Sequence, residues 1–101
     1  MNIFDDIKVD KTKEEFKEIL KSENIRIERI VSNGQTSEDE FWYDQDENEF
    51  VLILDGEAIL EFEDKEFILQ KGDCFDIKAH IKHRVKYTSK DKPTIWLAVF
   101  Y

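Results

Sequence analysis

The stretch from Tyr43 to Gly56 has the sequence YDQDENEFVLILDG, in which an acidic loop runs into an apolar segment. Phe50 to Leu54 is apolar at every position, which is typical of a β-strand covered on both faces. Asp55-Gly56 is a turn pair that ends it. Glu49 stands at the entrance, where a carboxylate is costly unless a partner pairs with it or coordinates it. The stretch therefore predicts a buried strand with a carboxylate that needs a partner.

Alternating apolar and polar residues predict further strands on both sides of this stretch. The turn signals between them include Asn33-Gly34 and Lys71-Gly72-Asp73. About eight short strands with turns at this spacing predict an all-β fold, an antiparallel β-barrel or jelly roll. The strand candidates are residues 25–31, 41–43, 50–54, 57–63, 67–69, 74–77, 83–87 and 95–101.

One segment near the N-terminus has a helical pattern instead. Thr12 and Glu15 fit a capping box, and Phe16, Ile19 and Leu20 recur at helical spacing. We expect a short amphipathic helix over residues 12–22 that lies across the outside of the β domain.

Length and composition predict one domain over residues 1–101. The chain has 15 basic and 24 acidic residues, a net charge of −9, which disfavours nucleic acid and anionic membranes as partners. Cys74 is the only cysteine, so an intrachain disulfide is excluded, and we expect it to be a buried small hydrophobe. No apolar run is long enough for a transmembrane helix, and no signal-peptide pattern is present. The expected location is the cytoplasm.

Two motifs within residues 43–87 resemble those of small single-domain cupins. Glu49, six intervening residues and Gly56 match the second half of the first cupin motif. Gly72-Asp73 through His83 is similar to the second motif, and 15 residues separate Gly56 from Gly72. The resemblance implies the cupin double-stranded β-helix and a metal site at the barrel mouth.

The ligand set implied by this resemblance is incomplete. The family's first motif has two histidines before the glutamate, and these positions fall on Tyr43 and Gln45. Glu49 and His83 match as metal ligands, and Gln45 and His80 could add an amide oxygen and a second nitrogen. Such a donor set suits a divalent ion such as Zn, Ni, Fe or Mn. Nothing in the sequence indicates an organic cofactor.

Two functional hypotheses follow. One is a metal-dependent cupin that acts on or binds a small polar molecule. The other is a metal-free cupin that binds a small ligand without chemistry, or serves as a structural domain. In either case we expect Trp42, Tyr43, Gln45 and Tyr87 to line the ligand pocket. The apolar segments Phe50–Leu54 and Ile95–Tyr101, together with the cupin resemblance, predict a homodimer.

Overall fold

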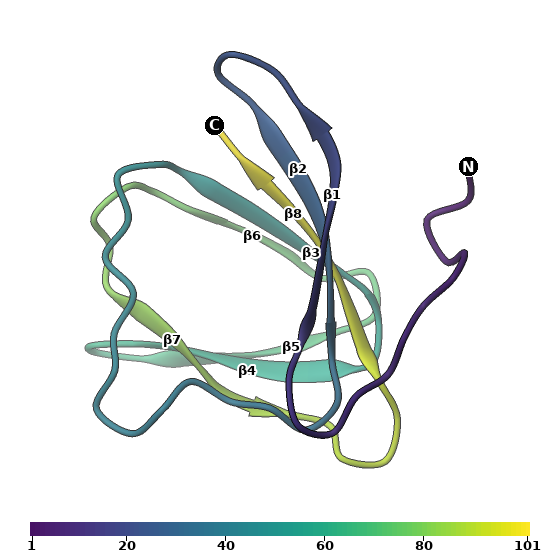
Figure 1. Ribbon diagram of the computed structural model, residues 1–101. Helices are drawn as coiled ribbons and strands as arrows, with labels where there is room; N and C mark the ends of the chain where they lie inside the picture. The colour runs from purple at the N-terminus through teal and green to yellow at the C-terminus, as the bar shows by residue number, and fades with distance from the viewer.

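The computed structural model describes residues 1–101 and contains eight β-strands in two antiparallel sheets (Figure 1). The five-stranded sheet has the order β1-β2-β8-β3-β6, and the three-stranded sheet has the order β5-β4-β7. This confirms the predicted all-β jelly roll. No part of the chain forms a helix capable of spanning a membrane. The strands are β1 (Glu15–Lys21), β2 (Arg26–Ser32), β3 (Glu49–Asp55), β4 (Glu57–Phe62), β5 (Glu66–Gln70), β6 (Cys74–Ile77), β7 (His83–Thr88) and β8 (Thr94–Phe100).

The core lies between the two sheets. It is formed by the inward-facing residues of each strand, such as Val51 and Ile53 on β3 and Leu60 and Phe62 on β4. The period-two alternation of these strands places one face of each sheet in this core. Cys74 is exposed on the edge strand β6, so its predicted burial is wrong: its face of β6 is not covered.

The predicted helix over residues 12–22 is wrong, because this segment forms strand β1. β1 pairs antiparallel with β2, and the register shifts between Glu18 and Leu20. This bulge adds a residue at Ile19, which places two apolar residues in succession and imitates a helical spacing. The capping-box threonine is used differently: the backbone N–H and hydroxyl of Thr12 both donate to Asp10 Oδ1. Tertiary pairing thus overrides local propensity.

The connection from β2 to β3, residues 33–48, covers the outer edge of β7. Ser37 N donates to Val85 O at 2.9 Å, and Tyr43 and His83 form an isolated antiparallel bridge. The predicted strand 41–43 is therefore reduced to this single bridge. The connection satisfies backbone groups that an edge strand would otherwise expose, and it places residues 43–45 beside the space between the sheets.

Gly56, in the turn between β3 and β4, is fixed by a close approach to the start of β8. Its φ is +93°, and a Cβ atom there would lie 2.5 Å from Thr94 Cα. Gly72, in the turn before β6, has a similar φ of +91° with nothing within 4 Å of the added atom. The two glycines thus share a backbone conformation and differ in their surroundings.

We expect Gly56→Ala to lower the free energy of unfolding by at least about 3 kcal/mol, because it adds a backbone clash to left-handed strain. Gly72→Ala should cost only about 1 kcal/mol, from the strain alone. Urea unfolding of both variants measures the difference. Equal losses would show that the contact with Thr94 relaxes at no cost.

Candidate functional site

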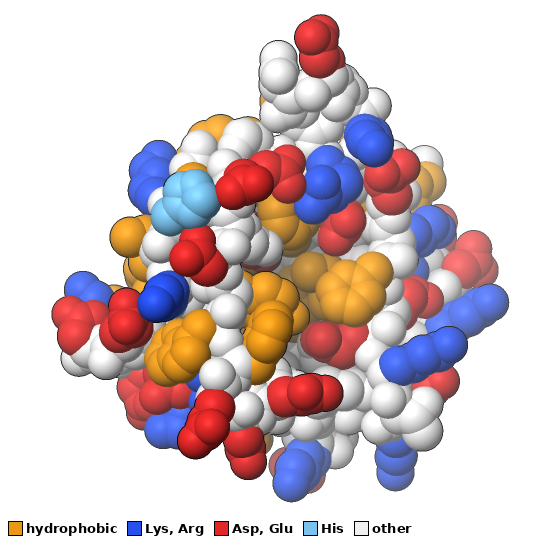
Figure 2. Space-filling view, turned by 60° about the vertical axis from the view of Figure 1, so that its left-hand side comes forward, with side chains coloured by type: hydrophobic (Ala, Val, Ile, Leu, Met, Phe, Trp, Pro, Cys, Tyr) orange, Lys and Arg blue, Asp and Glu red, His pale blue; other side chains and the backbone are white.

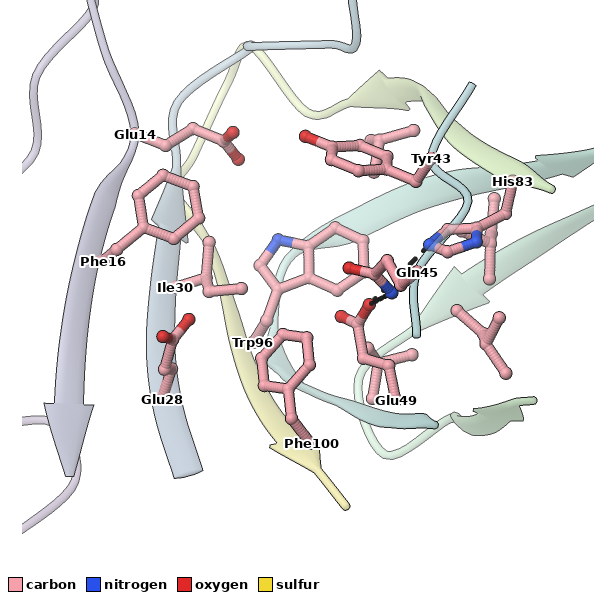
Figure 3. Close-up of a pocket in the computed structure, with 14 residues that line it drawn as sticks. Glu14, Phe16, Glu28, Ile30, Tyr43, Gln45, Glu49, His83, Trp96 and Phe100 are labelled. Atoms are coloured by element: carbon pink, nitrogen blue, oxygen red, sulfur yellow. Dashed lines mark hydrogen bonds and ion pairs between the residues drawn. The ribbon is translucent and has the colours of Figure 1, made fainter. Parts of the chain in front are cut away.

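A cavity of about 120 Å³ lies between the two sheets at one end of the barrel (Figure 3). Its walls come mainly from β2, β3, β7 and β8, with Tyr43 and Gln45 from the β2–β3 connection. Most of the lining is apolar, and it includes the rings of Phe16, Trp96 and Phe100. Polar side chains gather on the side where β3 and β7 begin, which makes this the candidate site.

Glu49 is the first residue of β3 and faces the cavity. Its strand register pairs it with Phe100 on one side and Ile77 on the other, so its backbone is held by two neighbouring strands. The residue is only 9% exposed. Gln45 Nε2 donates to Glu49 Oε1 at 3.0 Å. The other carboxylate oxygen, Oε2, receives no hydrogen bond from the protein.

His83 is the first residue of β7, in the opposite sheet, and is 5% exposed. Its Nδ1 lies 2.9 Å from Ile81 O. Because a carbonyl oxygen only accepts, Nδ1 carries the proton in this bond. The Tyr43 ring stacks on the imidazole with a centroid distance of 5.5 Å. These contacts fix the ring and leave Nε2 directed into the cavity.

The free nitrogen of His83 and the carboxylate of Glu49 face each other. His83 Nε2 lies 3.7 Å from Glu49 Oε1, which is too long for a hydrogen bond. The sequence predicts that Glu49 and His83 lie close together. They belong to strands of different sheets, and the fold brings both of them next to Gln45 (Figure 3). The three side chains converge on the polar side of the cavity.

Tyr43 lines the cavity as predicted, but its hydroxyl points toward Glu14 and away from the Glu49 carboxylate (Figure 3). Burial, followed by the charges of Glu14 and Glu49, raises the pKa of the Tyr43 phenol. The phenol therefore keeps its proton at neutral pH and offers a donor. This position suits a cavity wall better than a metal ligand.

Three predicted site residues lie outside the cavity. The His80 ring, 64% exposed, turns outward to Asp44 with Nδ1 2.8 Å from Oδ1, although His80 N donates to Gln45 O. Trp42 alternates with Tyr43 and faces away from the cavity, and the centroid of its ring lies 6.0 Å from the Arg84 guanidinium.

Tyr87 is turned outward by a β-bulge. Leu60 pairs with Val85, whereas Ile59 pairs with Tyr87, so Lys86 is an extra residue between them.

Several residues that line the cavity were not among the predicted site residues. Glu28 and Trp96 share the inward parity of their strands with Ile30 and Phe100, so alternation alone could have identified them. Glu14 and Phe16 could not be identified, because the helical assignment of residues 12–22 removed β1 from the barrel. They complete the wall opposite Tyr43 (Figure 3).

The converging side chains fit a divalent ion with one nitrogen and two oxygen donors. His83 presents a lone pair on Nε2, with Nδ1 donating to a backbone carbonyl, the arrangement usual for metal-binding histidines. Glu49 supplies a carboxylate, and the Gln45 amide can turn its oxygen inward, since the two orientations are nearly isosteric. No group of three His, Cys, Asp or Glu side chains suited to a metal is present. The donors therefore fit a site weaker than one with three charged or imidazole ligands.

The comparisons with known proteins agree with this fold. A cupin domain model matches residues 28–100, and the chain belongs to the cupin domain family. A protein of Ralstonia eutropha JMP134 named "putative mannose-6-phosphate isomerase" is 39% identical, with a TM-score of 0.95, covering 99% of this chain and 94% of its own.

More distant structures share the fold alone. A cupin superfamily protein from Desulfitobacterium hafniense DCB-2 is 20% identical, with a TM-score of 0.78, and the match covers 93% of this chain and 82% of that one. A conserved protein of unknown function from Streptococcus pyogenes is 14% identical, with a TM-score of 0.79, and the match covers 99% and 83%. The search of curated proteins found no match.

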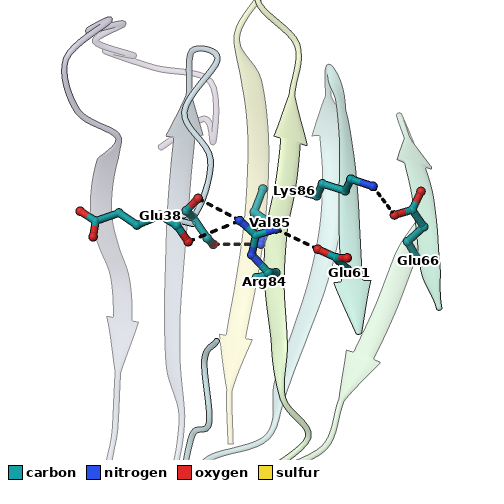
Figure 4. Close-up of polar contacts among 7 residues, drawn as sticks. Glu38, Glu61, Glu66, Arg84, Val85 and Lys86 are labelled. Atoms are coloured by element: carbon teal, nitrogen blue, oxygen red, sulfur yellow. Dashed lines mark hydrogen bonds and ion pairs between the residues drawn. The ribbon is translucent and has the colours of Figure 1, made fainter. Parts of the chain in front are cut away.

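The segment that carries Tyr43 is held on the outer face of β7 by Arg84 (Figure 4). Arg84 Nη1 donates to Glu61 at 2.8 Å, and Nη2 donates to the carbonyls of Ser37 and Glu38 at 3.3 and 3.4 Å. Lys86, also on β7, pairs only with Glu66, and both side chains are exposed. Arg84 therefore links the connection to the sheet, whereas Lys86 does not.

We expect Arg84→Gln to speed hydrogen exchange at the Tyr43 amide by about tenfold or more, because charge-assisted hydrogen bonds to the connection are lost. Lys86→Gln is the matched control and should change this rate by less than about threefold, since exposed ion pairs contribute little. Amide exchange measured by NMR tests both. An unchanged rate in Arg84→Gln would show that backbone pairing alone holds the segment.

Proposed function

We propose that this cupin binds a divalent metal ion at Glu49 and His83, with Gln45 as a third donor, and holds a small polar molecule in the adjoining cavity. The observation that carries the proposal is the buried pair itself: His83 Nε2 and Glu49 Oε1 face one cavity, 3.7 Å apart, with no hydrogen bond between them. A metal ion held by these two residues would give His83 Nε2 a partner and would add to the single hydrogen bond that Glu49 Oε1 accepts from Gln45.

A bound ion would act as a Lewis acid toward a carbonyl or hydroxyl oxygen of the ligand. The chain's own contribution is to orient and enclose. Tyr43 offers a protonated hydroxyl at the mouth, and Trp96 and Phe100 exclude water from the wall. A small molecule would thus be held with one polar end at Glu49 and His83 and its apolar part against the rings.

The metal-free alternative has its own supporting observation. Gln45 Nε2 donates to Glu49 Oε1 at 3.0 Å, so part of the carboxylate is satisfied by the protein itself. In that case Glu49 and His83 would contact the ligand directly, and the site would bind a molecule without metal chemistry. Metal affinity separates the two functions.

The name of the Ralstonia protein suggests hexose-phosphate isomerisation, and the cavity does not favour it here. A phosphomonoester carries close to two negative charges at neutral pH, and proteins bind such groups with Arg, Lys or backbone N–H groups. The cavity lining contains no Lys or Arg and three carboxylates, from Glu14, Glu28 and Glu49. We therefore do not extend that activity to this chain.

Metal binding is tested on protein purified without a His-tag. We expect near-stoichiometric binding of Zn²⁺, Ni²⁺, Mn²⁺ or Fe²⁺ by calorimetry, and added stability of about 2.7 kcal/mol when the free ion is at 100 times its Kd. His83→Ala and Glu49→Gln should lose the binding. Wild-type protein that gains no stability from any of these ions would contradict the proposal.

Two further variants sharpen this experiment. His80→Ala is the matched control, because it removes the other histidine of the chain from an exposed position and should leave the affinity unchanged. Gln45→His places an imidazole where the amide now meets Glu49 and should tighten Zn²⁺ binding by about tenfold or more, since imidazole is the better ligand. A loss in His80→Ala equal to that in His83→Ala would place the ion elsewhere.

The homodimer stays a prediction. The two apolar segments that suggested it lie in β3 and β8, which are inner strands of the five-stranded sheet with both edges paired. A second copy could meet only their half-buried outward side chains, such as Phe50, Leu52 and Leu97. Light scattering should give twice the 12.1 kDa chain mass, and Leu52→Glu should reduce it. A monomer at high concentration would contradict the prediction.

A further inference from the structure

The walls of the cavity define the kind of molecule that fits it, provided that the cavity is the ligand site of the proposed function. Four aromatic rings, from Phe16, Tyr43, Trp96 and Phe100, face a volume of about 120 Å³. The face shown in Figure 2 is hollowed, with hydrophobic side chains at the border of the hollow and acidic side chains close by. The body of a ligand would be small and apolar.

The charges around this volume have one sign. Glu14 lies directly before β1, Glu28 on β2 and Glu49 on β3, and no Lys or Arg lines the cavity. Arg26 neutralises Glu28 from outside, with Nε 3.0 Å from Oε2 and its guanidinium 4.2 Å above the Phe100 ring. Glu14 accepts a hydrogen bond from the neutral hydroxyl of Ser32 and has no cationic partner.

Inside the cavity, polar atoms lack partners. His83 is only 5% exposed, and its Nε2 makes no hydrogen bond. Glu49 Oε2 likewise receives none. Both side chains lie in the wall of the cavity, so these atoms are available to a bound group, and the cavity is more than an acidic surface.

We propose that the cavity selects a small organic cation, an amine with an apolar body, over neutral and anionic molecules. The ammonium group lies at the mouth beside the Glu14 carboxylate, near the Phe16 ring and the Tyr43 hydroxyl, which Figure 3 shows next to Glu14. Carboxylate attraction and cation–π contact both favour this place. The apolar body lies along Trp96, with the polar side of the cavity beyond it.

A matched set of probes tests the charge preference: benzylamine, benzyl alcohol and benzoate, titrated by NMR into metal-free protein. We expect benzylamine to bind at least tenfold more tightly than benzyl alcohol, and benzoate to bind most weakly. Added salt should reduce the preference, since it screens charges near the surface. Equal binding of amine and alcohol, tighter binding of benzoate, or no binding of any probe would overturn the proposal.

Two variants locate the effect. Glu14→Gln should reduce benzylamine affinity to that of benzyl alcohol and leave benzyl alcohol unchanged. Glu18→Gln removes an equal charge from an exposed position of β1 outside the cavity and should preserve the preference. Equal losses in both variants would show that net charge, and not the cavity, attracts the amine.

The metal titration keeps this inference separate from the proposed function. Protein that binds no metal but prefers the amine in a Glu14-dependent way would refute the metal site and support the cation preference. Protein that binds metal at Glu49 and His83 without any amine preference would support the metal site and refute the cation preference.

Discussion

Glu49 and His83 meet across the space between two sheets, and their encounter depends on the register of both. Each is the first residue of its strand, Glu49 paired with Phe100 and Ile77, and His83 paired with Phe62. A slip by one residue in either strand would turn its side chain to the outside. The β2–β3 connection adds a further restraint through the bridge at Tyr43. Several independent pairings therefore fix the positions of the buried carboxylate and imidazole.

The charged residues form two groups, those that hold the barrel together and those that line the cavity. All three arginines belong to the first group. Arg29, fully buried, donates to the carbonyls of Ile3 and Asp5 and to Glu15, while Arg84 and Arg26 make ion pairs on the outside of the barrel. In the cavity, Glu14 and Glu49 have no arginine or lysine partner, whereas Glu28 is paired with Arg26. In a low-dielectric volume these charges act more strongly on a ligand than they would in water. The same feature argues against phosphate esters and supports both a metal ion and an amine.

The sequence was sufficient for the fold class because alternation and turn residues agree along most of the chain. It also predicted that Glu49, His83, Gln45 and Tyr43 lie close together, since the two motifs place them at or near the starts of β3 and β7. It failed where a strand departs from period two. The bulge at Ile19 made β1 resemble a helix, and the bulge at Lys86 moved Tyr87 off the predicted face.

The orientation of loop side chains was also beyond sequence reasoning. His80 has a φ of +66°, and its ring is turned toward Asp44, so its spacing from His83 gave no indication of its direction. Glu14 and Phe16 were hidden for a different reason, because their contribution requires β1 to lie at the edge of the barrel. Such positions follow from tertiary pairing and not from local pattern.

The extra residue at Lys86 has a consequence for how such barrels diversify. If Lys86 were taken into regular pairing opposite Ile59, the residues after it in β7 would exchange faces, and Tyr87 would compete for an inward position. A change of this kind alters what a cavity presents without replacing any side chain that touches it. Within a family of barrels, single-residue insertions and deletions in strands are thus a route to new specificity that counting substitutions at aligned cavity positions would overlook.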